Sequence, residues 1–485
     1  MKTFWKYTLI TLLLLLGLFV LGVLFLFFVP GSNIFGITYI SYNAEYYSQS
    51  YSADSLEKLV FNSRSYNVNL VPSTTGKISV KVYTNAVGFT RTKYSKVNIS
   101  ATSRNKQLTL NVEEPHGMVF NNKSYIELRV PKDMSSDLNL VNRNANINFS
   151  NDSMSIGNLF YSTDFGSLTL NSGEITGNLD LEIGNGDVRI NKDFKLNDNR
   201  VAISVKNGMF DASECKLGVV TISDNTRGVI KINECVSINE RVQTAGGRLE
   251  LRTVESVNIQ SSDTDVYINQ LLNGGTIYLN TSSTATGKVE INETNGLTDI
   301  MTKEGSIIIH KSNDPLLLES TSGNIKAENA MKNVSAKSIY GNIEVYFSKD
   351  APAYDEADIS PSRALQASTN NGRIVCTGAN NVDITISGNG RVDLNFDDVL
   401  GESIIDGKNG SVAVKINKDS VYDLTTHSDQ GNVSVNLLQL SEFGGYTTNI
   451  DTTTHVNHNE DDPTTNSLYI TTFAGDLFVR DTTWG

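Results

Sequence analysis

The chain has 485 residues, and its 40 lysine and arginine residues against 53 aspartate and glutamate residues give a formal net charge of −13 at pH 7. This acidic balance argues against nucleic-acid binding and against docking on anionic lipid, since both need a basic surface. The three cysteines are too few for a scaffold built on disulfide bonds.

Residues 7–29 form an uncharged run dominated by leucine, phenylalanine and valine, long enough as a helix to cross a bilayer. Lys2 and Lys6 precede the run, and no basic residue follows until Lys58. The positive-inside rule therefore predicts that residues 1–6 stay in the cytoplasm and that the rest is exported. A cleaved signal peptide is the alternative, but it would have a shorter apolar region of about 7–15 residues and a small-residue cleavage site. We predict an uncleaved, single-pass signal anchor in the plasma membrane, with the bulk of the chain extracytoplasmic.

Residues 30–60 are rich in serine, tyrosine and asparagine and are predicted to form a linker. Three segments then alternate apolar and polar residues, at 77–83, 107–112 and 124–130, and this period of two predicts strands. They lack the glycine repeat of the segment that follows. Residues 61–131 are therefore predicted to form an antiparallel β cap, such as solenoids use to cover an open end.

A five-residue phrase then recurs through residues 132–440 and once more at residue 475, namely glycine, any residue, aliphatic, any residue, aliphatic. Many copies start about 10 or 20 residues apart, and a fixed period of this size marks a repeat architecture. The phrase starts at Gly166, Gly177, Gly186, Gly208, Gly218, Gly228, Gly247, Gly275, Gly287, Gly305, Gly323, Gly341, Gly372, Gly390, Gly410, Gly431 and Gly475.

The phrase predicts a turn followed by a half-buried strand. Its second and fourth residues after the glycine share one face of a strand, as in the pair Ile230 and Ile232, while the residue between them, here Lys231, is usually polar. The glycine is expected to supply a turn with positive φ. Because a strand of about five residues cannot bury its apolar face alone, coil must stack on coil. The predicted fold is all-β: a β-solenoid of the parallel β-helix type, with an N-terminal antiparallel cap and one preceding transmembrane helix.

Two polar segments interrupt the repeat, at residues 350–361 and 441–466. Insertions in solenoids form loops that leave the rod. In the first, Tyr354 and Ile359 lie between two prolines and offer an aromatic and an aliphatic contact, so this loop is a candidate for partner binding, with an unspecialised solvated loop as the alternative. Residues 441–485 are predicted to comprise the second polar loop and a terminal strand from Gly475 that covers the far end.

The cysteines do not indicate a catalytic thiol. Cys376 occupies an inward position of its phrase and is interpreted as a small core residue. Cys215 and Cys235 occupy equivalent places in successive repeats, where adjacent coils rise about 4.8 Å. A disulfide bond and a pair of free thiols are both compatible with this spacing.

Candidate catalytic and metal-binding groups are weak. His455 and His458 could offer two metal ligands but have no convincing third. The pairs Asp397–Asp398 and Asp461–Asp462 are the candidates for a glycosidase-like carboxylate pair, yet aspartate is abundant in these turns. We predict no catalytic residue, no metal site and no cofactor.

The segment Ser124-Tyr-Ile-Glu-Leu-Arg-Val-Pro131, with Leu138-Asn-Leu140 and repeats such as Gly323-Asn-Ile, resembles a bacterial "putative-adhesin" domain family of unknown function, related to auto-transporter adhesin head domains. The resemblance covers about residues 60–440, and the sequence departs from the pattern where Asn144-Ala-Asn146 replaces the first glycine. It implies a solenoid fold and adhesion, and it carries over no ligand residue.

The predicted function is a membrane-anchored, adhesin-like surface module without catalysis, whose partners are the membrane, through residues 7–29, and a surface protein or glycan of unknown identity. An envelope sensor or scaffold subunit is the first alternative. A β-helix polysaccharide lyase or hydrolase is the second, and it would require a cleft of converging carboxylates.

Overall fold

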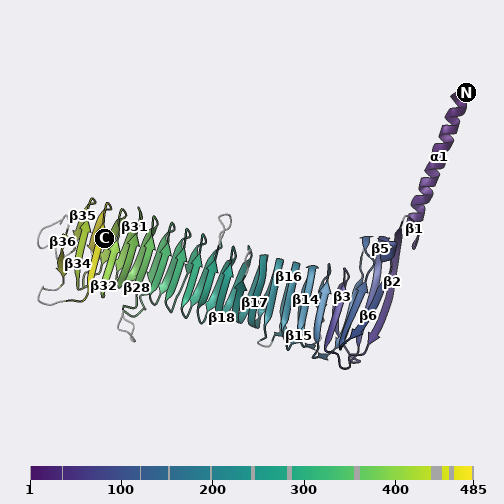
Figure 1. The fold of residues 1–485 in the computed structure, drawn as a ribbon, viewed down its shortest axis with the longest axis horizontal. Coiled ribbons are helices and arrows are strands. Elements are labelled where there is room, and N and C mark those ends of the chain that lie inside the picture. Colours follow the sequence, from purple (N-terminus) through teal and green to yellow (C-terminus); the bar gives the residue numbers. More distant parts are fainter. Residues whose placement is uncertain are drawn as a thin grey trace. The chain divides into compact units, whose positions relative to one another are not determined.

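The computed structural model describes residues 2–34, 36–120, 122–150, 153–196, 199–241, 246–280, 287–353, 361–437, 450–457 and 464–482. The chain divides into two compact units, Met1–Cys215 and Lys216–Gly485, both built mainly of β-strands (Figure 1).

The first unit begins with a helix and continues as strands of 2–18 residues before Val201. Its elements are α1 (Lys2–Phe27), β1 (Asn33–Ile34), β2 (Ile37–Tyr51), β3 (Lys58–Ser63), β4 (Asn67–Ser73), β5 (Ile78–Arg91), the 3₁₀ helix η1 (Thr92–Tyr94), β6 (Asn98–Arg104), β7 (Gln107–Glu113), β8 (Gly117–Phe120), β9 (Tyr125–Pro131), β10 (Asp133–Met134), β11 (Asp137–Asn142), β12 (Ile147–Phe149), β13 (Ser155–Ile156), β14 (Leu159–Phe165), β15 (Leu168–Ile175) and β16 (Leu179–Leu196).

The strand β17 (Val201–Arg241) begins in the first unit and ends in the second. The second unit then contains β18 (Arg248–Ser261), β19 (Asp265–Leu271), β20 (Gly275–Leu279), β21 (Val289–Thr294), β22 (Thr298–Thr302), β23 (Ile307–Ile309), β24 (Leu316–Ser320), β25 (Ile325–Ala330), β26 (Val334–Ser338), β27 (Ile343–Phe347), β28 (Ala364–Thr369), β29 (Arg373–Ala379), β30 (Asn381–Ile386), β31 (Arg391–Phe396), β32 (Glu402–Asp406), β33 (Ser411–Ile416), β34 (Tyr422–Ser428), β35 (Val433–Asn436), β36 (Ile450–Val456), β37 (Ser467–Thr472) and β38 (Leu477–Asp481).

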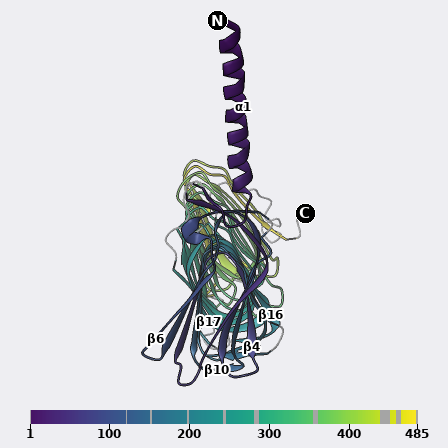
Figure 2. The same ribbon diagram turned by 90° about the vertical axis from the view of Figure 1, so that its right-hand side faces the viewer.

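The helix α1 contains the expected apolar run. Its window Trp5–Phe25 spans 21 residues, none of which is buried in the protein, and Figure 2 shows the helix clear of the strands. This length and composition suffice to cross a membrane, and an N-terminal signal sequence would meet the same criteria. Just after the helix, the Phe28 ring lies 5.8 Å from the Tyr39 ring and 5.7 Å from the Phe89 ring, centroid to centroid.

The expectation of a linker at residues 30–60 is wrong for residues 37–51, which form β2. This strand pairs antiparallel with β5, from Ile37 beside Arg91 to Tyr51 beside Ile78. Few of its side chains are buried, Ile40 among them, so its composition stays polar although its tyrosines favour strands.

The expected antiparallel cap is only partly correct. β5 does pair antiparallel with β8 and β9, and β6 with β7. However, β3 pairs parallel with both β7 and β11, and β4 pairs parallel with both β9 and β12. The segment that carries β3 and β4 is therefore a coil of the solenoid, and in space it lies between two coils that follow it in the chain.

In the second unit each coil contributes one strand to each of two parallel ladders. One ladder runs through β19, β21, β23, β25, β27, β29, β31 and β33, and the other through β20, β22, β24, β26, β28, β30 and β32. Apolar side chains from both ladders fill the space between them. This arrangement is the predicted β-solenoid.

The expectation that the terminal strand covers the far end is wrong. β38 pairs parallel with β33 on one side and with β35 on the other, while β37 pairs parallel with β32 and β34. The last coil in the chain thus lies between two earlier coils. β36, inside the segment predicted to be a polar loop, pairs antiparallel with β34.

The predicted alternation in the repeat is confirmed. Ile230 is fully buried and Ile232 is 2% exposed, whereas Lys231 between them reaches outward and its Nζ lies 3.2 Å from Glu250 Oε2. The other predicted inward pairs are buried as well: Val188 and Ile190, Leu249 and Leu251, Val289 and Ile291, Ile343 and Val345, and Val392 and Leu394.

The positive φ expected of the phrase glycines is present at most of those in the first unit and is absent from most of those in the second. Gly186 and Gly208 have φ values of +151° and +140°. Both of these glycines also stack closely on the glycine before them in space. In the second unit, successive glycines stack so closely that an added Cβ would lie within 3.0 Å of the carbonyl oxygen of the glycine before it, a distance that real Cβ atoms essentially never show. In spatial order this column is Gly287, Gly305, Gly323, Gly341, Gly372, Gly390, Gly410, Gly475 and Gly431.

Buried hydroxyl groups support this glycine column. Ser320 Oγ accepts a hydrogen bond from Gly323 N at 2.8 Å and donates one to Gly305 O at 3.3 Å, and Ser338 repeats the pattern with Gly341 N at 2.9 Å and Gly323 O at 3.2 Å. In the sequence, this support is visible as a serine or threonine three residues before the glycine. These hydroxyls satisfy backbone groups that the close stacking would otherwise leave buried and unpaired.

All three cysteines are buried free thiols, so the disulfide alternative for Cys215 and Cys235 is not realised. Burial raises the pKa of Cys215 to about 11 and that of Cys235 to about 12, which keeps both thiols protonated at neutral pH.

Candidate functional site

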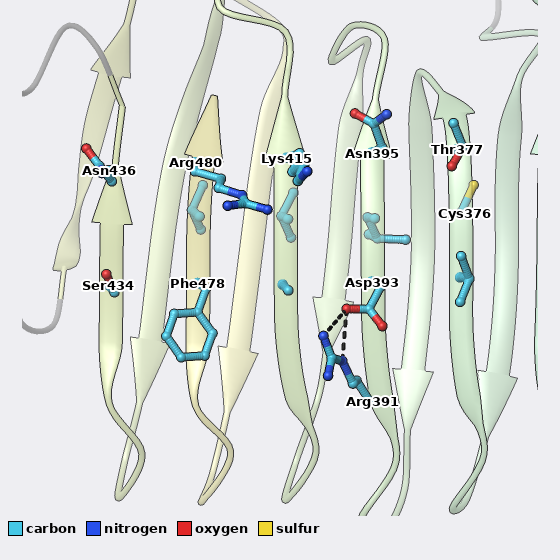
Figure 3. A pocket seen from close by; sticks show the side chains of 15 residues that line it. Cys376, Thr377, Arg391, Asp393, Asn395, Lys415, Ser434, Asn436, Phe478 and Arg480 are labelled. Carbon is cyan, nitrogen blue, oxygen red and sulfur yellow. Dashed lines mark hydrogen bonds and ion pairs between the residues drawn. The ribbon is translucent and has the colours of Figure 1, made fainter. Parts of the chain in front are cut away.

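An open groove of about 650 Å³ lies on the outer surface of the second unit, across the adjacent strands β29, β31, β33, β38 and β35 (Figure 3). Successive side chains of each strand point alternately into the core and out toward the groove. The inward partners, such as Leu394 and Val479, fill the core, and the residues between them point outward.

Parallel register aligns the outward residues in two rows that cross the five strands. The first row is Val375, Asp393, Ala413, Phe478 and Ser434. The second row is Thr377, Asn395, Lys415, Arg480 and Asn436.

The smallest side chain of the first row stands at its centre. Ala413 lies between Asp393 and Phe478, and its methyl group leaves space that longer neighbours border. Phe478 is 47% exposed and has Ser434 on its other side, so its ring is uncovered along the row (Figure 3).

The acidic side of the groove is neutralised by arginine. Arg391 donates to Asp393 Oδ1 from Nε at 2.9 Å and from Nη2 at 2.7 Å, drawn as dashed lines in Figure 3. Arg373 Nε donates to Asp393 Oδ2 at 2.7 Å. This carboxylate therefore has both oxygens engaged and fixes the two arginines in place.

The basic side of the groove is not neutralised. Lys415 and Arg480 are register neighbours on β33 and β38, and neither forms an ion pair with any residue that the structure describes. Beside them, Asn395 Oδ1 is buried and accepts no hydrogen bond within the described part of the chain. Arg480 extends across the sheet toward the strand of Lys415 (Figure 3).

Elsewhere on the same ladder, several outward charges are paired with opposite charges. His310 contacts Glu328 through Nδ1 at 2.8 Å and Glu290 through Nε2 at 3.2 Å, and Lys326 Nζ lies 2.6 Å from Glu328 Oε1. The Glu328 hydrogen bond is the largest of the effects that raise the pKa of His310. Against this pattern, the uncompensated pair Lys415 and Arg480 marks the groove as a local basic surface on an acidic chain.

The side chains of the groove are suited to noncovalent binding. The groove offers two unpaired cations besides the paired Arg391, an aromatic ring, amides and hydroxyls, and Asp393 is its one carboxylate among the described lining residues. Cys376 lies beneath it, 1% exposed, and burial raises the pKa of its thiol far above neutral pH, so it is not a nucleophile.

A second groove, of about 500 Å³, lies in the first unit beside Arg64, Tyr94 and His116. Arg64 Nη1 lies 2.8 Å from His116 Nε2, and the rings of Tyr94 and His116 have centroids 4.0 Å apart. Buried Glu114 accepts hydrogen bonds from the backbone N–H groups of Arg64 and Ser65 at 3.0 Å. Its carboxylate therefore stabilises the turn between β3 and β4.

The partner-binding residues predicted from the sequence, Tyr354 and Ile359, lie outside the described residues. His458 and the pair Asp461–Asp462 lie outside them as well, while His455 Nδ1 lies 2.7 Å from Asp423 Oδ1. Asp397 and Asp398 do not converge, because Asp397 Oδ2 accepts from Arg363 Nη1 at 2.6 Å and Asp398 Oδ1 from Val399 N at 2.8 Å. Among the described residues, no group of three histidine, cysteine or acidic side chains could hold a metal ion.

The groove could not be recognised from the sequence because its two unpaired cations come from distant repeats. Lys415 and Arg480 become neighbours only through the insertion of β38 beside β33. The sequence contains one local signal of unpaired charge. Lys415 on β33 and Arg480 on β38 occupy outward positions, and the outward position two residues before each is not acidic but is Ala413 or Phe478.

Three solved structures are similar over most of the chain. They are a "putative cell adhesion protein" from Clostridium sporogenes (9% identity, 91% of this chain and 100% of the other, TM-score 0.18), a "putative adhesin" from Bacteroides fragilis (11%, 78% and 99%, TM-score 0.21) and a "putative adhesin" from Parabacteroides distasonis (12%, 73% and 98%, TM-score 0.17). At these TM-scores the superpositions do not support a shared site.

A comparison with curated proteins found no match. Residues 56–374 match the family described as Toastrack DUF4097, a β-solenoid family, and this match covers most of the repeat region and the strands before it. The resemblance inferred from the alternating strand and the glycine repeats is thereby confirmed: the chain belongs to the Toastrack DUF4097 family.

Proposed function

We propose that the protein is a membrane-anchored, extracytoplasmic binding module that displays its β-solenoid at the cell surface and recognises a partner without converting it chemically. The groove across β29, β31, β33, β38 and β35 is the observation that carries this proposal. It combines uncompensated charge, an exposed aromatic ring and hydrogen-bonding amides, which are the contacts that provide recognition.

The apolar helix supports the membrane part of the proposal. Trp5–Phe25 is long enough to span a bilayer, and none of it is buried in the protein. Its apolar side chains therefore stay exposed unless a membrane covers them. Lys2 and Lys6 precede it, and this asymmetry favours an exported solenoid.

Binding is favoured over polysaccharide cleavage by the state of the carboxylate in the groove. Glycosidases need two carboxyl groups that flank the scissile bond, one of them free to exchange a proton. Asp393 accepts hydrogen bonds from two arginines, which engage both of its oxygens, and no second carboxyl group lines the groove among the described residues.

The experiment compares intact cells that produce the full chain with cells that lack it. External protease is expected to remove the solenoid while the N-terminal helix stays in the membrane fraction, and adhesion of the cells to polysaccharide-coated surfaces or to neighbouring cells is expected to fall after this treatment. Protection of the solenoid in intact cells and its cleavage only after lysis would reject the orientation. An accessible solenoid whose removal leaves adhesion unchanged would reject the binding function.

A further inference from the structure

We propose that the groove on β29, β31, β33, β38 and β35 binds an acidic polysaccharide. Lys415 and Arg480 contact carboxylate or sulfate groups of the polymer, and Phe478 packs against a sugar ring. This inference rests on the proposed function as a binding module and names the chemical class of its ligand.

The charge argument starts from the register. Lys415 and Arg480 are direct cross-strand neighbours in a parallel sheet, whose strands lie about 4.8 Å apart. Like charges in directly opposite positions destabilise a sheet, and the structure provides no carboxylate to offset this pair among the residues it describes. An anionic group placed between the two side chains would remove the repulsion and accept charge-assisted hydrogen bonds from both.

The aromatic argument concerns the shape beside the cations. Phe478 is about half exposed, and its row neighbours Ala413 and Ser434 are small, so a flat group can lie over the ring and reach the hollow above Ala413. The C–H face of a pyranose ring is such a flat, apolar group, and an aromatic side chain offers it a large contact area at little entropic cost.

Hydrogen-bonding groups complete the match to a sugar. Thr377, Asn395, Ser434 and Asn436 line the same groove and can both donate and accept hydrogen bonds, as hydroxyl groups require. A simple inorganic anion would use only the two cations.

The length of the groove favours a polymer over a single sugar. It crosses five strands, which at about 4.8 Å per strand spacing gives roughly 19 Å between the first and the last. The chain as a whole has a net charge of −13, so its long-range electrostatic field does not attract a polyanion. The two local cations must therefore provide the attraction. Binding is therefore expected to weaken steeply with added salt.

The test uses the full chain in detergent micelles and measures binding to three immobilised polymers: polygalacturonate with carboxylates, dextran sulfate with sulfates, and uncharged dextran. The wild type is expected to bind at least one acidic polymer and not dextran, and preference between the two acidic polymers identifies the charged group. The double variant Lys415→Gln with Arg480→Gln is expected to bind at least tenfold more weakly.

The matched control is the double variant Lys326→Gln with Lys337→Gln, which removes two outward charges of the same unit that are already paired with Glu328 and Glu319. It should bind as the wild type does. Ala413→Leu fills the hollow without changing charge and is also expected to weaken binding at least tenfold, as is Phe478→Ala. Circular dichroism checks that each variant is folded.

Equal loss in the groove and control double variants would overturn the proposal, because it would show that only net charge matters. Unchanged binding by both Ala413→Leu and Phe478→Ala, wild-type binding to uncharged dextran equal to that of the acidic polymers, or no binding to any acidic polymer would overturn it too. None of these results decides the proposed function, which is judged by adhesion of whole cells and by protease access.

Discussion

The backbone N–H of Gly401 donates a hydrogen bond to Asn466 Oδ1 at 2.8 Å, although 65 residues separate the two in the chain. The same side chain donates through Nδ2 to Val421 O at 3.2 Å. Asn466 precedes β37, and Gly401 and Val421 precede the strands β32 and β34 on either side of it. One asparagine therefore joins the inserted coil to both coils that enclose it.

The replacement Asn466→Ala is expected to destabilise the C-terminal coils by about 0.5–1.5 kcal/mol, because it removes a part-buried hydrogen bond to one flanking coil and an exposed one to the other. Hydrogen exchange should show loss of protection in both β32 and β34. Asn417→Ala is the control, since Asn417 Oδ1 accepts only a local hydrogen bond from Asp419 N at 3.2 Å. Loss of protection confined to β37 would show that the residue does not join the two flanking coils.

Gly323→Ala is expected to reduce the free energy of unfolding of the second unit by about 3 kcal/mol or more. The added methyl group would collide with the carbonyl oxygen of Gly305, which is backbone and cannot move aside, and would crowd Ser320 Oγ. Thermal unfolding followed by circular dichroism measures the effect. Exposed Ser322→Ala, one residue away, should cost about 0.5 kcal/mol or less, and a similar cost for both would contradict the close packing of the glycine column.

The alternation of the repeat predicts opposite outcomes for neighbouring positions. Ile232→Asp places a carboxylate in the core, where Ile232 is 2% exposed, and should destabilise the unit by about 3–5 kcal/mol. Lys231→Asp should cost about 1 kcal/mol at most, because the change is at the surface and only exchanges an ion pair with Glu250 for a repulsion. Chemical denaturation compares the two, and equal destabilisation would mean that the inward and outward positions have been misassigned.

Glu240 is expected to make stability depend on pH. It is fully buried, its Oε1 accepts a hydrogen bond from Thr264 Oγ1 at 3.3 Å, and burial raises the pKa of its carboxyl group from 4.5 to about 7. Since the folded-state pKa is above the unfolded one, the stabilising contribution is complete below about pH 4.5 and is lost as the pH rises through about 7. The loss is on the order of 3 kcal/mol.

The variant Glu240→Gln removes this titration, so it should be more stable than the wild type at pH 8 and about equal to it at pH 4.5. Unfolding by urea at the two pH values measures the difference. Exposed Glu402→Gln is the control and should change neither value appreciably. A variant that is less stable than the wild type at pH 8 would show that the carboxylate is held in its charged form.

The repeated phrase was sufficient to predict the fold class and the orientation of most core residues. Its information is local: each glycine, each inward aliphatic pair and each polar residue between them restrict one strand, as Gly228, Ile230, Lys231 and Ile232 do. The polar strand β2 was not predicted because it buries few side chains and so shows no apolar alternation in the sequence.

The order of the coils could not be predicted in the same way. Any coil can stack on any other, because each presents the same backbone hydrogen-bonding groups and the same aliphatic pair. At both described ends the order of the coils in space differs from their order in the chain. In the first unit β3 and β4 lie between β7 with β9 and β11 with β12, and in the second β37 and β38 lie between β32 with β33 and β34 with β35.

The sequence by itself determined that this protein is an all-β solenoid with an apolar N-terminal helix, because strand alternation, turn glycines and helix hydropathy act over a few residues and leave a direct pattern. Only the tertiary structure decided where the basic groove lies. The basic groove exists because β38 inserts beside β33 and brings Arg480 against Lys415, with Phe478 next to Ala413. That contact depends on which coil edges meet, and the hydrogen bonds that hold them, such as those of Asn466, join residues far apart in the chain.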